Sequence, residues 1–327
     1  ENFKAKRGFT MVFRYSFICN ILLTFIFTQV SHESTPRSFL LNQTSEIPII
    51  AMEEIDIERF LEEDAAEREK PYRFGYGIDV DISMENSGSW TIIDNGSKIW
   101  QLQIESSRAF SLNIIYDQYH LPLGTEFFLY TLDRSMVLGA FTDFNHKPHG
   151  GFSTSPLEGE VSILEYNEPA NAEFTGQIQL ESVIHGYKDV FFHQGRGYGD
   201  SGSCNNNVMC SEGNPWESDI RSVAMILTSG GSRLCTGALV NNVRQDLSPL
   251  FLTANHCLGG NNSWIFMFNY QSPGCANQNG PTNMTVSGSS LLANHSTSDF
   301  ALLELNENPP EDYNVHYAGW SAIDTAP

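Results

Sequence analysis

Short apolar runs separated by Gly, Pro and Asn fill the chain from about residue 76 to 190. Residues 89–94 and 97–104 flank Asn95-Gly96, which predicts a β-hairpin with a type I′ turn. More short apolar runs follow, at 111–119, 125–132, 136–143 and 159–167. Several strands at this spacing, with no helical period between them, predict an antiparallel β-sandwich over residues 76–190.

A second series of short strands is predicted in the C-terminal part of the chain. Apolar runs at 220–228 and 233–240 flank Gly230-Gly231 as a hairpin. Further runs lie near 249–253, 263–270, 284–293 and 299–306. Six strands joined by short turns predict a small antiparallel barrel within residues 204–327. The Gly-rich segment 191–203 between the two series is typical of a linker.

The N-terminal part of the chain has a different character. Met11 begins a segment with a basic start and an apolar run at 17–27, which predicts a signal peptide over 11–32 and therefore export. The ten residues before Met11 are interpreted as translated upstream sequence. Residues 33–75 form an acidic pro-segment, in which 53–69 carries nine acidic and two basic residues and predicts a solvated helix.

Charge and cysteine count narrow the function classes. Eighteen Lys and Arg against 39 Asp and Glu give a net charge of −21, which disfavours nucleic acid and anionic lipid as partners. The apolar run at 17–27 is too short to span a bilayer comfortably, so no stable membrane insertion is expected, and a retained amphipathic anchor is the less favoured alternative. Of six cysteines, Cys19 falls in the predicted signal peptide, which leaves five. An odd number implies a free thiol, an intermolecular bridge, or a partner outside this sequence.

Two strings carry candidate chemistry: LTANHC at 252–257, which ends an apolar strand, and TSDFALLEL at 297–305, which begins one. Together with SGSCNNNVMC at 201–210, CTGALVNN at 235–242, FNYQSPGC at 268–275 and YAGW at 317–320, they resemble the secreted lysyl endopeptidase-like branch of the chymotrypsin-clan serine proteases. The resemblance covers about residue 197 to the end. It implies an all-β chain in which the sandwich precedes the first barrel, and the start of the second part, of a chymotrypsin-like double β-barrel.

The resemblance assigns roles to two residues. His256 would be the general base that takes a proton from a serine hydroxyl, and Asp299 would orient its imidazole. Taken singly, a His after a strand and an Asp before one are usually surface or turn residues; their joint occurrence favours catalysis.

Ser201 lies in a Gly-Asp-Ser-Gly string that resembles a nucleophile loop. The triad order in this family is His, Asp, Ser, so Ser201 precedes His256 and is a decoy. The nucleophile is expected beyond Pro327, and the fragment itself is expected to be inactive.

The resemblance also implies the disulfides Cys235–Cys257 and Cys210–Cys275. Cys204 would then be unpaired because its partner lies in the missing second barrel. No cofactor or metal is expected, since His146 and His149 lack a third ligand and fit a solvated loop better. Asn255, directly before His256, departs from the Ala or His that relatives often carry there.

Two functions of different classes remain open. The first is a secreted, monomeric, bacterial serine endopeptidase that acts on proteins or peptides through an acyl-enzyme, with Lys preference as a family-level expectation. The second is a non-catalytic exported binding protein, a pseudo-protease whose β-sandwich is the functional module. The residue at the downstream Gly-x-Ser-Gly position distinguishes them. The sandwich is either a pro-region that is removed or a retained accessory domain.

Overall fold

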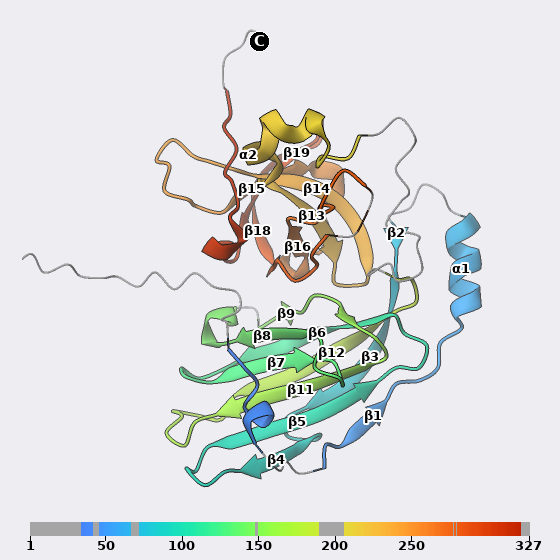
Figure 1. The fold of residues 1–327 in the computed structure, drawn as a ribbon, viewed down its shortest axis with the longest axis vertical. Coiled ribbons are helices and arrows are strands. Elements are labelled where there is room, and N and C mark those ends of the chain that lie inside the picture. Colours follow the sequence, from blue (N-terminus) through green and yellow to red (C-terminus); the bar gives the residue numbers. More distant parts are fainter. Residues whose placement is uncertain are drawn as a thin grey trace, which may run out of the picture.

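The computed structural model describes residues 34–41, 46–66, 72–147, 150–189, 206–276, 278 and 280–321. Three β-sheets and a few short helices make up this part of the chain, so the all-β prediction is confirmed (Figure 1). No helix in these ranges is long and apolar enough to span a membrane. The predicted signal peptide, the 191–203 linker, Ser201, Cys204 and His149 lie outside the described residues.

The N-terminal half is a sandwich of two sheets. The first contains β1 (Ile49–Ala51), β4 (Ser89–Ile92), β5 (Lys98–Glu105), β7 (Glu126–Tyr130), β8 (Val137–Phe141) and β11 (Val161–Glu168). The second contains β3 (Gly75–Ser83), β6 (Ser111–His120), β9 (Phe152–Ser153), β10 (Leu157–Glu158) and β12 (Gln177–Gly186). Their inner faces bury one apolar cluster that includes Trp100, Tyr116, Tyr119, Phe127 and Tyr166. Burial of such large aromatic side chains supplies most of the stabilisation of a sandwich core.

The hairpin between β4 and β5 forms where the sequence predicts it, but the predicted type I′ turn is wrong. A type I′ turn needs positive φ at both central residues. Here Gly96 has φ 80° and Asn95 is not in the left-handed region. The amide of Gly96 donates to the carbonyl of Ile93, and the amide of Ile93 donates to the carbonyl of Ser97. This is a type I turn followed by a left-handed glycine, the usual three-residue hairpin loop.

The acidic segment is packed against the sandwich. Its helix α1 (Ile57–Ala66) buries Phe60, whose ring stacks on Tyr76 at 4.5 Å and on Tyr187 at 5.6 Å. Asp64 accepts a hydrogen bond from the Tyr187 hydroxyl at 2.7 Å and pairs with Lys188 at 2.5 Å. The predicted helix is present, but one of its faces is buried and is not solvated as predicted.

The C-terminal half is a curled sheet around a second core. Its strands are β13 (Val223–Thr228), β14 (Ser232–Val240), β15 (Leu250–Ala254), β16 (Ile265–Phe268), β17 (Thr285–Ser287), β18 (Ser289–His295) and β19 (Phe300–Leu305). The core includes Phe251, Trp264, Phe266 and Leu303. Gly288, at φ 77°, separates β17 from β18, so that β17 pairs with β16 while β18 pairs with β19. The two end strands of the sheet are therefore consecutive in sequence, as a barrel requires.

The first barrel strand begins later than predicted. The 3₁₀ helix η3 (Ser211–Trp216) leads directly into the short helix α2 (Glu217–Ile220), so β13 starts at Val223 and not at Ile220. Both helices precede β13 in the chain and are drawn yellow in Figure 1.

The segment from β2 (Tyr72–Arg73) to β3 runs from the barrel sheet into the sandwich. Strand β2 pairs with β14, and the amides of Phe74 and Gly75 both donate to the carbonyl of Gly231, at 2.7 and 2.9 Å. The Phe74 ring is buried with Leu227, Ile265 and Met267 of the barrel. A Cβ on Gly231 would lie 2.9 Å from the Cα of Gly75, so this close approach requires glycine. Residues just before β3 thus belong structurally to the barrel sheet.

A buried ion pair also joins the two halves. Lys147 of the sandwich pairs with Glu307, which follows β19, and the two side chains are only 8% and 12% exposed. Asn145, which is fully buried, donates to Glu307 at 3.5 Å. Burial raises the pKa of the Glu307 carboxyl, and the Lys147 ammonium opposes this rise. The sequence-based prediction of a solvated loop is therefore wrong at Lys147, because this loop packs against the barrel.

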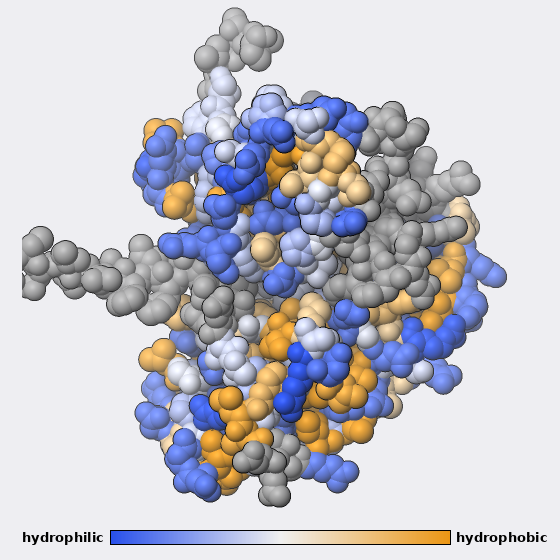
Figure 2. Space-filling view, in the orientation of Figure 1, coloured by the Kyte–Doolittle hydropathy of each residue, from blue (hydrophilic) through white to orange (hydrophobic). Residues whose placement is uncertain are grey.

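The exposed apolar side chains are mostly dispersed. In Figure 2 hydrophobic residues are more prominent on the sandwich half than on the barrel half. The exposed large apolar residues include Ile49, Ile92, Leu123 and Leu132 of the sandwich, which come from separate strands and turns. Single exposed apolar residues are normal on the surface of a folded protein.

Replacement of Lys147 tests the interface. Lys147→Met should leave the Glu307 carboxylate buried without its ammonium partner and lower the free energy of unfolding by about 3–5 kcal/mol. The double variant Lys147→Met/Glu307→Leu should recover most of this loss. Urea unfolding measures both. Equal losses in the single and double variants would contradict a buried pair at this position.

Candidate active site

Strand pairing brings His256 and Asp299 together. Strand β15 runs antiparallel to β19, with Ala254 opposite Phe300. His256 lies in the 3₁₀ turn η4 (Asn255–Cys257) that follows β15, and Asp299 directly precedes β19. Residues that flank a paired position on neighbouring strands are close in space. The register of this pair therefore joins two residues 43 positions apart in the chain.

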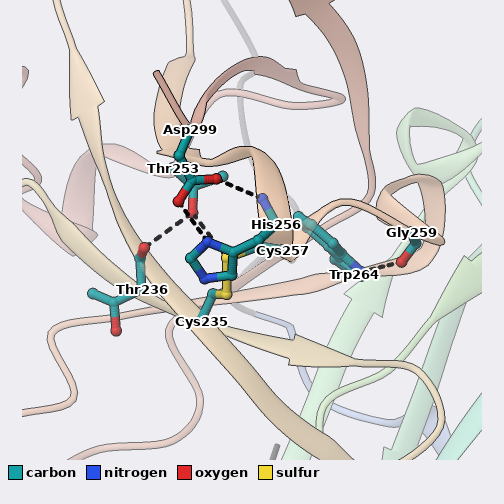
Figure 3. Close-up of a disulfide and its surroundings, with 8 residues drawn as sticks. All are labelled: Cys235, Thr236, Thr253, His256, Cys257, Gly259, Trp264 and Asp299. Carbon is teal, nitrogen blue, oxygen red and sulfur yellow. Dashed lines mark hydrogen bonds and ion pairs between the residues drawn. A yellow bond between two sulfur atoms is a disulfide. The ribbon is translucent and has the colours of Figure 1, made fainter. Parts of the chain in front are cut away.

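The two side chains make a direct hydrogen bond (Figure 3). Nδ1 of His256 lies 2.6 Å from Oδ2 of Asp299, and the backbone amide of His256 donates to Oδ1 at 2.9 Å. The backbone amide of Asn255 donates to the carbonyl of Asp299 at 3.1 Å. Because the carboxylate faces Nδ1, it favours the tautomer in which Nδ1 carries the proton and Nε2 is a free base.

The electrostatics of the pair favour an ionised carboxylate. The hydrogen bond from the His256 side chain, followed by the one from its backbone amide, lowers the pKa of Asp299 below the usual value of 3.8. The side chains of His256 and Asp299 are 70% and 46% exposed. Solvent therefore screens this pair, and its value lies in orientation more than in stability.

A disulfide fixes the turn that carries His256. Cys257 is buried and bonded to Cys235 of β14. Beside it, the hydroxyl of Thr253 donates to the carbonyl of Thr236 at 3.0 Å, and the indole of Trp264 donates to the carbonyl of Gly259 at 3.1 Å (Figure 3). The disulfide thus ties the turn to β14, while the two hydrogen bonds join β15 to β14 and the loop after the turn to Trp264.

A second disulfide joins Cys210 to Cys275. Both disulfides are the pairs that the resemblance implies. Cys204 lies outside the described residues, so its state stays a prediction.

Among the described residues, one cluster has the composition of a metal site. It consists of Cys235, His256 and Cys257. Both sulfurs are bonded to each other, and a metal ligand must be a thiolate. The cluster therefore offers His256 as a single ligand, which does not hold a zinc ion.

The sequence did not indicate one contact of the turn. The side chain of Asn255 accepts a hydrogen bond from the amide of Asn294, on β18, at 2.6 Å. In the sequence, Asn255 stands out only as a departure from relatives, and no local pattern identifies Asn294 as its partner. Because the contact joins strands 39 residues apart, it follows from sheet register and not from any local pattern.

Comparison with known proteins agrees with this geometry. Residues 198–327 match the family model described as "Lysyl endopeptidase, C-terminal domain". These residues are similar in sequence to that domain. A curated protein named lysyl endopeptidase, from Pseudomonas aeruginosa, is 30% identical over 187 residues, which are 52% of this chain and 40% of that protein. The chain thus spans about two fifths of this relative's length. Both His256 and Asp299 fall within the part that matches the family model.

Removal of the Cys235–Cys257 disulfide tests its structural role. The double variant Cys235→Ala/Cys257→Ala opens a loop with a sequence separation of 22 residues. Chain-entropy arguments predict a loss of about 3 kcal/mol in the free energy of unfolding. Thermal or urea unfolding measures it, with the Cys210–Cys275 bond left intact as the control. An unchanged midpoint would contradict a stabilising role.

The lowered pKa of Asp299 gives a pH prediction. A carboxyl group with a depressed folded pKa stabilises the fold above its unfolded pKa, and this contribution is lost as the pH falls through the folded value. The contact with His256 should therefore persist at pH 3.8. It should break only when the pH falls through the lower, folded pKa of Asp299. In His256→Ala the pKa of Asp299 should rise toward 3.8, as followed by the carboxyl ¹³C shift. An identical titration curve in both proteins would show that His256 does not cause the shift.

Proposed function

We propose that this protein is a secreted serine endopeptidase in which His256 and Asp299 are two members of a Ser-His-Asp triad. The observation that carries the proposal is the hydrogen bond between Nδ1 of His256 and Oδ2 of Asp299, within a lysyl endopeptidase-like domain. An imidazole oriented in this way has Nε2 free to act as a base. The His256 side chain is exposed, so a bound substrate can approach it. Two disulfides in the described residues are compatible with an oxidising, extracellular compartment.

The proposed mechanism gives His256 and Asp299 separate roles. Nε2 of His256 takes the proton from a serine hydroxyl as the oxygen attacks the peptide carbonyl carbon. The carboxylate of Asp299 holds the imidazole in the required tautomer and stabilises the imidazolium that forms. His256 then gives the proton to the leaving amine, and an acyl-enzyme remains. Water, deprotonated by the same Nε2, hydrolyses the acyl-enzyme and restores the serine.

We assign the nucleophile to a serine outside these 327 residues. In chymotrypsin-like proteases the triad serine follows the aspartate in the chain, and Ser201 precedes both His256 and Asp299. No hydrogen bond to Nε2 of His256 occurs among the described residues. The 327-residue chain alone is therefore expected to be inactive, and activity is expected of the full-length protein.

Substrate preference is proposed from the comparison and from charge. The matching family model and the curated relative both carry the name lysyl endopeptidase, which supports cleavage next to Lys. A net charge of −21 attracts cationic peptides to the protein surface, although it does not define a pocket. We propose protein or peptide substrates with Lys at the cleaved bond, and no requirement for a cofactor.

The test is hydrolysis by the full-length protein. Peptide substrates that differ only in Lys, Arg or Leu at the cleaved position should rank with Lys first. His256→Ala should lower kcat/KM by roughly 10⁴–10⁶-fold with the unfolding midpoint unchanged. His316→Ala is the matched control and should retain activity, because the contact that His316 makes is from its backbone amide to the carbonyl of Arg221. Full activity in His256→Ala would overturn the proposal, and absence of hydrolysis in the wild-type protein would favour the binding-protein alternative.

A further inference from the structure

The backbone at Asp299 is held in an unusual conformation. Asp299 has φ 53°, in the left-handed region, which few non-glycine residues adopt, although Asp does so more often than most. Residues keep such angles only where the surrounding structure determines them. At Asp299 this conformation directs both carboxylate oxygens at His256, one to Nδ1 and one to the backbone amide. The groups that fix the conformation therefore also fix the orientation of the proposed base.

Three chain segments meet at this point. The carbonyl of Asp299 accepts from the backbone amide of Asn255, in the turn after β15. The side chain of Asn255 in turn accepts from Asn294 of β18 at 2.6 Å. Asn294 is opposite Ala301 in the β18–β19 pairing, and Ala254 is opposite Phe300 in the β15–β19 pairing. The side-chain bond therefore connects the two strands that flank the start of β19.

A separate contact closes the β18–β19 turn itself. Ser298 directs both its amide and its hydroxyl at Nδ1 of His295, at 3.4 and 3.2 Å. Asp299 thus lies between two contacts, one within the turn and one that joins β18 to η4. Only the second involves a residue adjacent to His256.

We propose that Asn255 and Asn294 are positioning residues, which hold Asp299 in its left-handed conformation and its carboxylate against His256. This inference rests on the proposed function for its catalytic consequence. Asn294 bonds to the side chain of Asn255, and the backbone amide of Asn255 bonds to Asp299, so both residues act on His256 through Asp299.

The contact is a poor candidate for a purely stabilising role. Asn255 is half-buried and Asn294 is exposed, and a hydrogen bond open to water contributes little to the free energy of folding. Its loss should therefore be seen in the His256–Asp299 geometry, and should change the folding equilibrium constant by no more than about 10-fold.

The first test reads the tautomer of His256 by ¹⁵N NMR at pH 8.5, where an ordinary imidazole is neutral. It uses the 327-residue chain and needs no catalytic activity. Asn294→Leu keeps the side-chain shape but removes the donor, and should lower the ratio of Nδ1–H to Nε2–H tautomer about 3–10-fold. Asn255→Ala should do the same. The double variant should show no larger effect than either single variant, because both act through one contact.

Two further variants make the test specific. Asn294→Asp should retain the wild-type tautomer ratio, because the Asn255 amide can rotate and donate to the new carboxylate. Ser290→Ala, on the same strand and exposed, is the control and should also leave the ratio unchanged. A wild-type ratio in Asn294→Leu would overturn the inference, and so would a fall of equal size in Ser290→Ala.

The second test measures kinetics in the full-length protein. Asn294→Leu should lower kcat about 3–10-fold with KM within 2-fold of wild type, and Asn294→Asp should restore kcat. An unchanged kcat in Asn294→Leu would contradict a positioning role. If the wild-type protein does not hydrolyse peptides, the proposed function fails, while the tautomer measurement still decides whether Asn255 and Asn294 position Asp299.

Discussion

The antiparallel register of β15 with β19 is the constraint on which the candidate site depends. It sets Ala254 opposite Phe300, and so fixes which residue beyond each strand end faces the other. A shift by one residue would turn every side chain of a strand to the opposite face and separate His256 from Asp299. The alternation of buried and exposed residues along β19, with Ala301, Leu303 and Leu305 in the core, prevents such a shift.

Other interactions hold this register in place at several levels. The disulfide between Cys235 and Cys257 joins the turn of His256 to β14, which is the other neighbour of β15. Strand β2 adds a strand from the sandwich side to β14, and the buried Lys147–Glu307 pair anchors the end of β19 to a sandwich loop. The sandwich contains neither His256 nor Asp299, but it is attached to the strands that form the candidate site. These contacts connect the sandwich and the barrel structurally.

Local patterns predicted much of this architecture. Apolar runs and turn residues predicted the strands on either side of His256 and Asp299, and the motifs around them pointed to the pair itself. The sequence did not predict β2, the buried face of α1 or the environment of Lys147, because each depends on a contact between distant segments. A lysine beside proline and glycine is usually solvated, and only the packing of the two halves brings Glu307 to it. The turn at Asn95-Gly96 shows the same limit, since loop length and closing hydrogen bonds selected a type I turn over the type I′ turn that the dipeptide favours. Asn294 was missed for a related reason, because its role depends on which strand lies beside it.

Covalent labelling can show whether His256 activates a serine. The full-length protein would be treated with a fluorophosphonate and its intact mass and labelled peptide determined, beside His256→Ala. The wild-type protein is expected to carry one adduct per chain, on a serine that follows Asp299 in sequence. The His256→Ala variant is expected to carry almost none. Labelling at Ser201, labelling that does not depend on His256, or no labelling of the wild-type protein would contradict it.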